Sequence, residues 1–310
     1  MKAVVFAYHN VGVRCLKVLL DGGVDVALVV THEDNPNEKI WFGSVAQVAA
    51  EQGLRCIAPA DPNADDLRRA CAEAEPDFLF SFYYRQMLGA PLLALPRRGA
   101  YNMHGSLLPR YRGRAPVNWA VLNGERETGA SLHAMEVKPD AGAIVDQFAV
   151  PILRDDTARE VFDKVTLAAE IVLARSLPHL LDGSAVLRPQ TALPGQYFGG
   201  RRPEDGRIPA QAGARRIHDL VRAVAPPDYP GAFFDSEAGR VLIERTRIAV
   251  DGHHPEDGGE LALRAHDGAL WLDAADGGCL RVLAAALDGA PLDAAGFAHR
   301  FGNKALVPAR

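Results

Sequence analysis

An asparagine and a histidine with the potential for oxyanion chemistry lie two residues apart in the sequence. Asn102 and His104 end a predicted strand at 99–104, and residues 105–109 then turn the chain. Alternate side chains of a strand point to the same face, so we expect these two to share one. An amide can stabilise an oxyanion while an imidazole moves a proton, which suits a reaction through a tetrahedral intermediate. In the structural alternative, Asn102 caps the turn and His104 is a hydrogen-bonded core residue.

A third candidate, Asp140, follows Pro139 in a predicted turn at 138–142. Asp and Gly commonly form turns, which is the structural alternative for this residue. If Asp140 instead lies beside His104, its carboxylate raises the pKa of the imidazole by stabilising the charged ring. The sequence spacing leaves open whether the two residues meet.

The pattern of apolar residues predicts the sheet that must position these side chains. Buried-strand runs occur at 2–8, 25–31, 55–58 and 77–82, separated by helical patterns at 13–20, 43–52 and 63–75, and a long helical pattern occupies 157–181. This alternation predicts a Rossmann-like, mostly parallel α/β sheet with helices on both faces. Ligands bind at the carboxyl ends of strands in such sheets. Tyr83 and Tyr84 follow the fourth strand run, and strand alternation sends one of them to the core.

The first strand-to-helix turn reads AYHNVG, which contains only Gly12 of a G-x-G-x-x-G fingerprint. We therefore reject NAD or FAD binding by this turn.

A segment rich in Pro, Gly and Arg at 189–207 predicts a domain junction. We expect a catalytic domain at residues 1–200 and a smaller domain at residues 201–310. The smaller domain has one helical pattern at 214–224 and short strand patterns at 231–234, 241–250, 260–265, 270–272 and 280–285. Short strands separated by turns predict a small, OB-like β-barrel.

Composition narrows the class of protein. The 310 residues include 34 Lys and Arg against 39 Asp and Glu, a net charge of −5, without the basic surplus typical of proteins that grip nucleic-acid phosphates. The four cysteines are scattered, which favours a reducing compartment over a disulfide framework. There is no signal peptide and no apolar run of about 18 residues, so we expect a cytoplasmic enzyme or binding protein without a membrane span.

Three motifs resemble those of the formyltransferases that use 10-formyltetrahydrofolate. The first and longest runs Asn102-x-His104-Gly105-Ser106-Leu107-Leu108-Pro109-x-Tyr111-Arg112-Gly113 and is followed by Pro116 and Trp119. Asp140-Ala141-Gly142 resembles the second motif of the family, and residues 198–206 resemble its junction motif. The resemblance extends over nearly the whole chain and implies a folate-dependent N-formyltransferase.

The resemblance also implies roles for particular residues. Asn102 would stabilise the tetrahedral oxyanion, His104 would be the general acid, and Asp140 would raise the pKa of His104. Contacts to the co-substrate 10-formyltetrahydrofolate would fall at Gln86, Met87, Leu88, Arg114, Glu136, Val137, Lys138, Pro139 and Asp140. No metal and no covalent enzyme intermediate are needed, because the amine attacks the formyl carbon directly.

Four stretches resemble, within this family, the formyltransferase domains of bifunctional polymyxin-resistance proteins. Those domains formylate UDP-4-amino-4-deoxy-L-arabinose for lipid A modification, and the matching stretches are 6–9, 31–39, 81–85 and 112–116. The leading hypothesis is therefore formylation of that sugar nucleotide, with another amino-sugar nucleotide as the alternative. Tyr8, Arg201 and Arg202 are the expected substrate contacts, since guanidinium groups suit a diphosphate. Alternatively, the two arginines are solvated linker charges.

Two other functions compete with this hypothesis. Methionyl-tRNA formyltransferases share the chemistry, but residues 201–310 carry 14 Lys and Arg against 16 Asp and Glu, whereas a tRNA-binding barrel should be basic. The joint presence of Asn102, His104 and Asp140 argues against a non-catalytic folate or nucleotide binder. We expect a small-molecule nucleotide-sugar substrate and no nucleic-acid partner, and the sequence leaves the oligomeric state open.

Overall fold

The computed structural model describes residues 1–36, 38–191, 197–249 and 259–309. The chain divides into two compact units. The first comprises Met1–Pro116, Glu127–Pro151 and Phe162–Gly199, and the second comprises Val117–Arg126, Ile152–Val161 and Gly200–Arg310. Two segments from the first 200 residues thus group with the second unit. The expected boundary at residue 200 stays a prediction, and residues 192–196 of the expected junction lie outside the described part of the chain.

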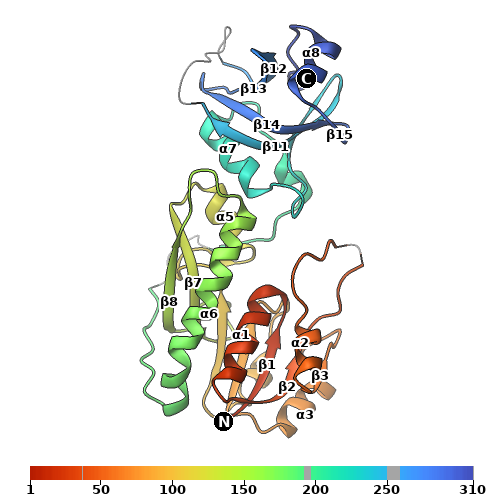
Figure 1. Ribbon diagram of the computed structural model, residues 1–310. Helices are drawn as coiled ribbons and strands as arrows, with labels where there is room; N and C mark the ends of the chain where they lie inside the picture. Colours follow the sequence, from red (N-terminus) through yellow and green to blue (C-terminus); the bar gives the residue numbers. More distant parts are fainter. Residues whose placement is uncertain (37, 192–196, 250–258, 310) are drawn as a thin grey trace. The chain divides into compact units, whose positions relative to one another are not determined.

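A seven-stranded sheet in the order β3-β2-β1-β4-β5-β7-β8 organises the first unit (Figure 1). Its strands are β1 (Lys2–Ala7), β2 (Asp25–Val30), β3 (Cys56–Ile57), β4 (Phe78–Phe82), β5 (Ala100–His104), β7 (Glu127–Ala134) and β8 (Ile144–Pro151). The strands from β1 to β5 are parallel, whereas β7 pairs antiparallel with both β5 and β8. The strand order reverses between β1 and β4, and sheets of this kind bind ligands outside the strand ends at such a point.

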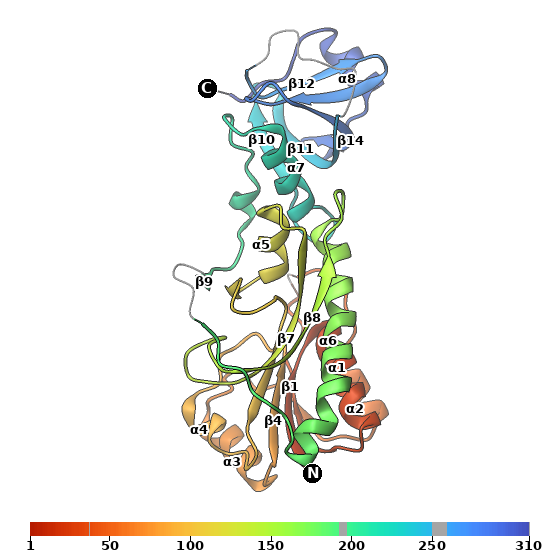
Figure 2. The same ribbon diagram turned by 90° about the vertical axis from the view of Figure 1, so that its left-hand side faces the viewer.

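Helices cover both faces of this sheet, which explains the continuous apolar runs of its central strands (Figure 2). One face carries α1 (His9–Asp21), α2 (Val45–Glu51) and α6 (Ala158–Asp182), and the other carries α3 (Asp65–Glu73) and α4 (Ala90–Leu93). Val4, Leu28 and Leu79 pack in one buried cluster with Leu67 of α3 and Leu92 of α4. The predicted mostly parallel α/β sheet with helices on both faces is therefore confirmed.

Two further strands and three helical segments complete the elements up to the second sheet. The strands β6 (Arg112–Gly113) and β9 (Tyr197–Phe198) pair in parallel within the first unit. The helices are α5 (Pro116–Leu122), a 3₁₀ turn at Pro203–Gly206, and α7 (Ala214–Ala223).

The second unit contains an antiparallel half-barrel against which α7 packs. Its strands are β10 (Ala232–Ser236), β11 (Gly239–Ile248), β12 (Ala262–His266), β13 (Ala269–Asp273), β14 (Cys279–Leu287) and β15 (Ala290–Pro291). Its helix α8 (Ala294–Phe301), which the sequence pattern did not predict, begins after Asp293, whose side chain accepts from the N–H of Gly296. Val250, the end of an expected strand, lies outside the described residues. Within those residues, no helix combines the length and the apolar character that crossing a membrane requires.

Candidate active site

A cavity of about 500 Å³ opens at the carboxyl ends of β4 and β5 in the first unit. Its walls come from these strand ends, from the loop after β4, and from the segment between β7 and β8. A volume of this size is typical of a small-molecule site. Asn102, His104 and Asp140 all line it, so the structure brings the three candidates together.

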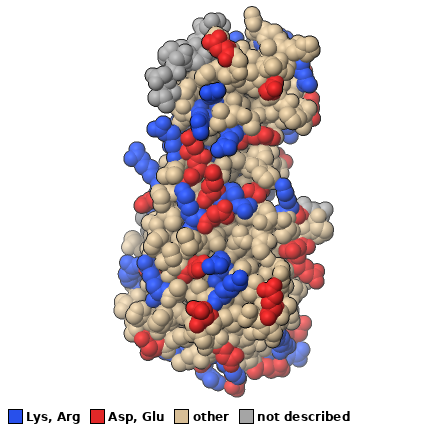
Figure 3. Space-filling view, viewed as in Figure 1, with Lys and Arg blue, Asp and Glu red and all other residues tan. Residues whose placement is uncertain are grey.

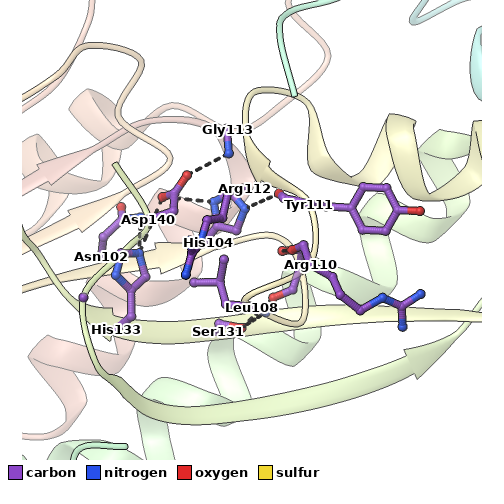
Figure 4. Close-up of polar contacts among 12 residues, drawn as sticks. Asn102, His104, Leu108, Arg110, Tyr111, Arg112, Gly113, Ser131, His133 and Asp140 are labelled. Atoms are coloured by element: carbon purple, nitrogen blue, oxygen red, sulfur yellow. Dashed lines mark hydrogen bonds and ion pairs between the residues drawn. The ribbon is translucent and has the colours of Figure 1, made fainter. Parts of the chain in front are cut away.

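His104 and Asp140 lie side by side (Figure 4). The Nδ1 atom of His104 is 3.5 Å from Oδ1 of Asp140, and its Nε2 atom is 2.9 Å from the carbonyl oxygen of Tyr111. A carbonyl oxygen only accepts, so Nε2 carries a proton. Nδ1 is therefore the nitrogen that gains and loses a proton, beside the carboxylate.

The pKa values of His104 and Asp140 both lie below their ordinary values, for different reasons. Burial lowers the pKa of His104, and Asp140 raises it by a smaller amount, so the pKa lies below its ordinary value. Asp140 raises the pKa of His104 as expected. Burial outweighs this effect because the charged ring loses hydration in the cavity wall. Burial raises the pKa of Asp140, but His104, His133 and the N–H of Gly113 together lower it by more, so the pKa of the carboxyl lies well below its usual range.

The turn that carries Asp140 is held through its backbone and its side chain. The N–H of Gly113 donates to Oδ2 of Asp140 at 2.8 Å. The side-chain amide of Gln190 donates to the carbonyl oxygens of Asp140 and Gly142, and its own oxygen accepts from Arg112. Asp140 itself has a φ of +51°, a left-handed conformation that Asp tolerates in turns. The position of the carboxylate is thus fixed by contacts from distant segments of the chain.

A fourth polar residue, His133, belongs to this cluster, although no motif in the sequence points to it. The antiparallel register pairs Asn102 of β5 with His133 of β7, and the two side chains meet with 3.1 Å between Nδ2 and Nε2. His133 is 2% exposed and also lines the cavity. Alternation along β7 places Ser131 and His133 on the same face of the strand. Only the pairing of β7 with β5 shows which residues of β5 lie opposite them.

Ser131, which pairs with His104 in the same register, ties down the turn that follows β5. Its hydroxyl donates to the carbonyl oxygen of Ser106 and accepts from the N–H of Leu108 (Figure 4). Gly105 is needed in this turn because a Cβ there would collide with the hydroxyl of Tyr83.

Most of the predicted folate contacts lie on the cavity wall. Those that line it are Gln86, Met87, Leu88, Arg114, Glu136, Pro139 and Asp140. Val137 and Lys138 are exposed and are absent from the lining. Contact with a folate stays a prediction for all of these residues.

Tyr83 and Tyr84 both line the cavity, and Tyr84 also packs against the buried cluster of the sheet, as expected for one of the two. The strand β4 ends at Phe82, and Tyr83 has a φ of +58°. The ring centre of Tyr83 lies 5.6 Å from that of Phe162, whereas the ring centre of Tyr84 lies 5.2 Å from that of Phe6.

The three expected substrate contacts, Tyr8, Arg201 and Arg202, are absent from the lining of this cavity. Tyr8 is buried and lines a second cavity of about 370 Å³, where its hydroxyl donates to Asp34. Arg201 and Arg202 belong to the second unit, in which the Arg201 guanidinium lies 4.7 Å from the ring centre of Trp119. The backbone N–H of Arg202 donates to the carboxylate of Asp205. Their role in substrate binding stays a prediction.

Comparison with known proteins agrees with this architecture. The sequence profile of the formyl transferase family matches residues 1–177, and the profile of the formyl transferase C-terminal domain matches residues 201–302. An N-formyltransferase from Helicobacter canadensis, solved with folinic acid and dTDP-3-aminofucose, has a TM-score of 0.70 at 18% identity, covering 91% of this chain and 98% of its own. A sugar 3N-formyl transferase, solved in the presence of dTDP and 5-N-formyl-THF, has a TM-score of 0.68 at 18% identity, covering 91% and 97%. Methionyl-tRNA formyltransferase from Clostridium thermocellum has a TM-score of 0.56 at 15% identity, covering 81% and 95%. At such identities these solved structures support the fold.

Proposed function

This chain belongs to the formyl transferase family, and on that premise we propose that it transfers a formyl group from 10-formyltetrahydrofolate to the amine of a nucleotide-linked amino sugar. The observation that carries the proposal is the meeting of Asn102, His104 and Asp140 in one cavity. Two structural neighbours are sugar N-formyltransferases whose structures hold a formylated folate and a dTDP ligand, which supports the choice of both substrates.

The residues of the cavity suit direct transfer. The amine attacks the formyl carbon, a new C–N bond forms, and the carbonyl oxygen gains negative charge. Asn102 offers an amide N–H to that oxygen, and a donor placed in this way stabilises the transition state. His104 then gives the proton at Nδ1 to the leaving folate nitrogen as its bond to carbon breaks, and the proton that the attacking amine loses balances the one delivered to the folate. Asp140 remains ionised beside Nδ1 and favours the charged ring from which the proton is delivered.

The finer proposal is that the sugar nucleotide is UDP-4-amino-4-deoxy-L-arabinose. Three of the stretches that resemble enzymes acting on this sugar meet in space. The Arg85 guanidinium lies 4.7 Å from the ring centre of Tyr8 and forms a two-pronged ion pair with Glu38. Residues from these three stretches therefore gather around Arg85, which lines the cavity. This clustering supports a shared recognition surface.

Charge supports a small substrate over tRNA. Residues 201–310 have a net charge of −2. On the face drawn in Figure 3, Lys and Arg side chains are interspersed with Asp and Glu side chains. A tRNA-binding surface would need a basic excess to replace the counterions of the phosphates.

The test is a panel of amines offered with 10-formyltetrahydrofolate, followed by release of tetrahydrofolate. The panel contains UDP-4-amino-4-deoxy-L-arabinose, dTDP-linked amino sugars and methionyl-tRNA. We expect the highest kcat/KM with the UDP sugar. A higher value with a dTDP sugar would replace only the finer proposal, whereas preferred turnover of methionyl-tRNA would overturn the proposed function.

A further inference from the structure

We propose that His133 is the positioning residue for the proposed oxyanion-binding amide: its Nε2 atom accepts one N–H of Asn102 and so fixes the side chain whose second N–H meets the oxyanion. The inference rests on the proposed function for its chemistry and on the contacts of His133 for its geometry. These contacts join two strands of the sheet within the first unit.

The contacts of the imidazole determine its tautomer. Nδ1 of His133 is 2.8 Å from the carbonyl oxygen of Ala134, which can only accept. Nδ1 therefore carries the ring proton, and the lone pair of Nε2 faces Nδ2 of Asn102 at 3.1 Å. Oδ1 of Asp140 is 3.6 Å from the same Nε2 atom, farther away than the amide nitrogen of Asn102. The amide is thus the nearer partner of Nε2.

This contact determines which way round the side-chain amide of Asn102 lies. An amide side chain presents a donor and an acceptor that exchange places when it rotates by a half turn. Rotation would set the carbonyl oxygen of Asn102 against the lone pair of His133, and two acceptors repel. The buried imidazole therefore holds the amide nitrogen on its side, and one N–H remains for the reaction. A donor fixed before the reaction stabilises developing charge without reorganisation.

Two substitutions separate the contacts of His133. In His133→Asn, the shorter amide can reproduce the donor to Ala134 but does not reach Asn102. In His133→Gln, the longer side chain can place an acceptor where Nε2 lies. We expect His133→Asn to lower kcat about 10- to 100-fold, with KM for both substrates within about twofold, because removing an oxyanion donor outright costs about 10²–10³-fold. His133→Gln should keep kcat within about threefold of the wild type.

His179→Asn, a change at an exposed histidine of the first unit, is the matched control and should leave kcat unchanged.

Coupling to Asn102 distinguishes positioning from a general structural role. If His133 acts through Asn102, then His133→Asn should lower kcat by less than about threefold in an Asn102→Ala background. Equal losses in both backgrounds would overturn the proposal, as would a wild-type kcat for His133→Asn. Thermal unfolding of each variant checks the fold, and if His133→Asn does not fold, a loss of activity in folded His133→Gln contradicts the proposal.

A measurement without turnover separates this proposal from the proposed function. Selective ¹⁵N labelling of histidine reports which ring nitrogen of His133 carries the proton. We expect the Nδ1–H form in the wild type, and the Nε2–H form would overturn the inference. If the Nδ1–H form is found but no amino-sugar nucleotide is formylated, the contact stands and the proposed function fails.

Discussion

At the scale of single residues, the site depends on opposing effects at one imidazole. Burial lowers the pKa of His104 and the neighbouring Asp140 raises it. A general acid works only in its protonated form, so in the proposed mechanism the carboxylate extends the pH range over which His104 donates a proton. The carboxyl remains ionised because its own pKa lies well below the usual range. The proposed mechanism therefore predicts that activity depends on pH through this pair.

We expect Asp140→Asn to move the alkaline fall in kcat/KM to lower pH. Removing the carboxylate removes an influence that raises the pKa of His104, so the ring loses its proton at lower pH. The measurement is a pH–rate profile of the variant beside that of the wild type. An alkaline limb at an unchanged pH would contradict the coupling of the two residues.

Loss of the proposed catalytic groups should affect turnover more than binding. We expect His104→Ala to lower kcat about 10²–10⁴-fold and Asn102→Ala about 10²–10³-fold. The dissociation constant for the sugar nucleotide, measured by calorimetry, should stay within about threefold because both groups act on the transition state. Normal turnover by either variant would remove that residue from its assigned role.

At the scale of elements, the site is assembled by the segment that follows β5. Gly113 of β6 donates its N–H to Asp140 and pairs with Phe198 of β9. Its φ is +102°, and an added Cβ would collide with the carbonyl oxygen of Phe198. The glycine therefore joins the pairing of β6 with β9 to the placement of the carboxylate.

Gly113→Ala should damage both stability and turnover. We expect the free energy of unfolding to fall by about 1–3 kcal/mol from backbone strain, and kcat to fall as the donor to Asp140 moves. Chemical denaturation and steady-state kinetics measure the two effects. Gly53→Ala is the matched control, because Gly53 has a φ of +66° and open space around it. A loss of stability without a loss of kcat in Gly113→Ala would show that the N–H of Gly113 does not position Asp140.

At the scale of the whole molecule, the charge of the chain limits its partners. Acidic residues outnumber basic residues in the full sequence and also in residues 201–310. The second unit has the half-barrel fold matched by the formyl transferase C-terminal domain, yet it lacks a net basic charge. Its fold alone therefore gives no reason to expect a polyanionic partner.

We expect this protein to show no saturable binding of tRNA at about 0.15 M salt. Phosphate contacts by Lys and Arg would produce affinity that falls steeply with salt concentration, and the charge balance does not favour them. A filter-binding titration at two salt concentrations makes the measurement. Tight binding with a steep salt dependence would contradict the expectation and would revive methionyl-tRNA as a substrate.

The sequence alone predicted the alternating strands and helices that begin the first sheet and the shared face of Asn102 and His104. Both depend on the periodicity of neighbouring residues, which local sequence encodes directly. The helix α8 escaped prediction.

Only the tertiary structure decided which distant groups meet. The register between β5 and β7 places His133 against Asn102, and contacts with Gly113 and Gln190 place Asp140 beside His104. Burial also reversed the net direction of the shift in the pKa of His104. Strand register and loss of hydration arise from packing between segments far apart in the chain, and periodicity along one segment contains no information about either.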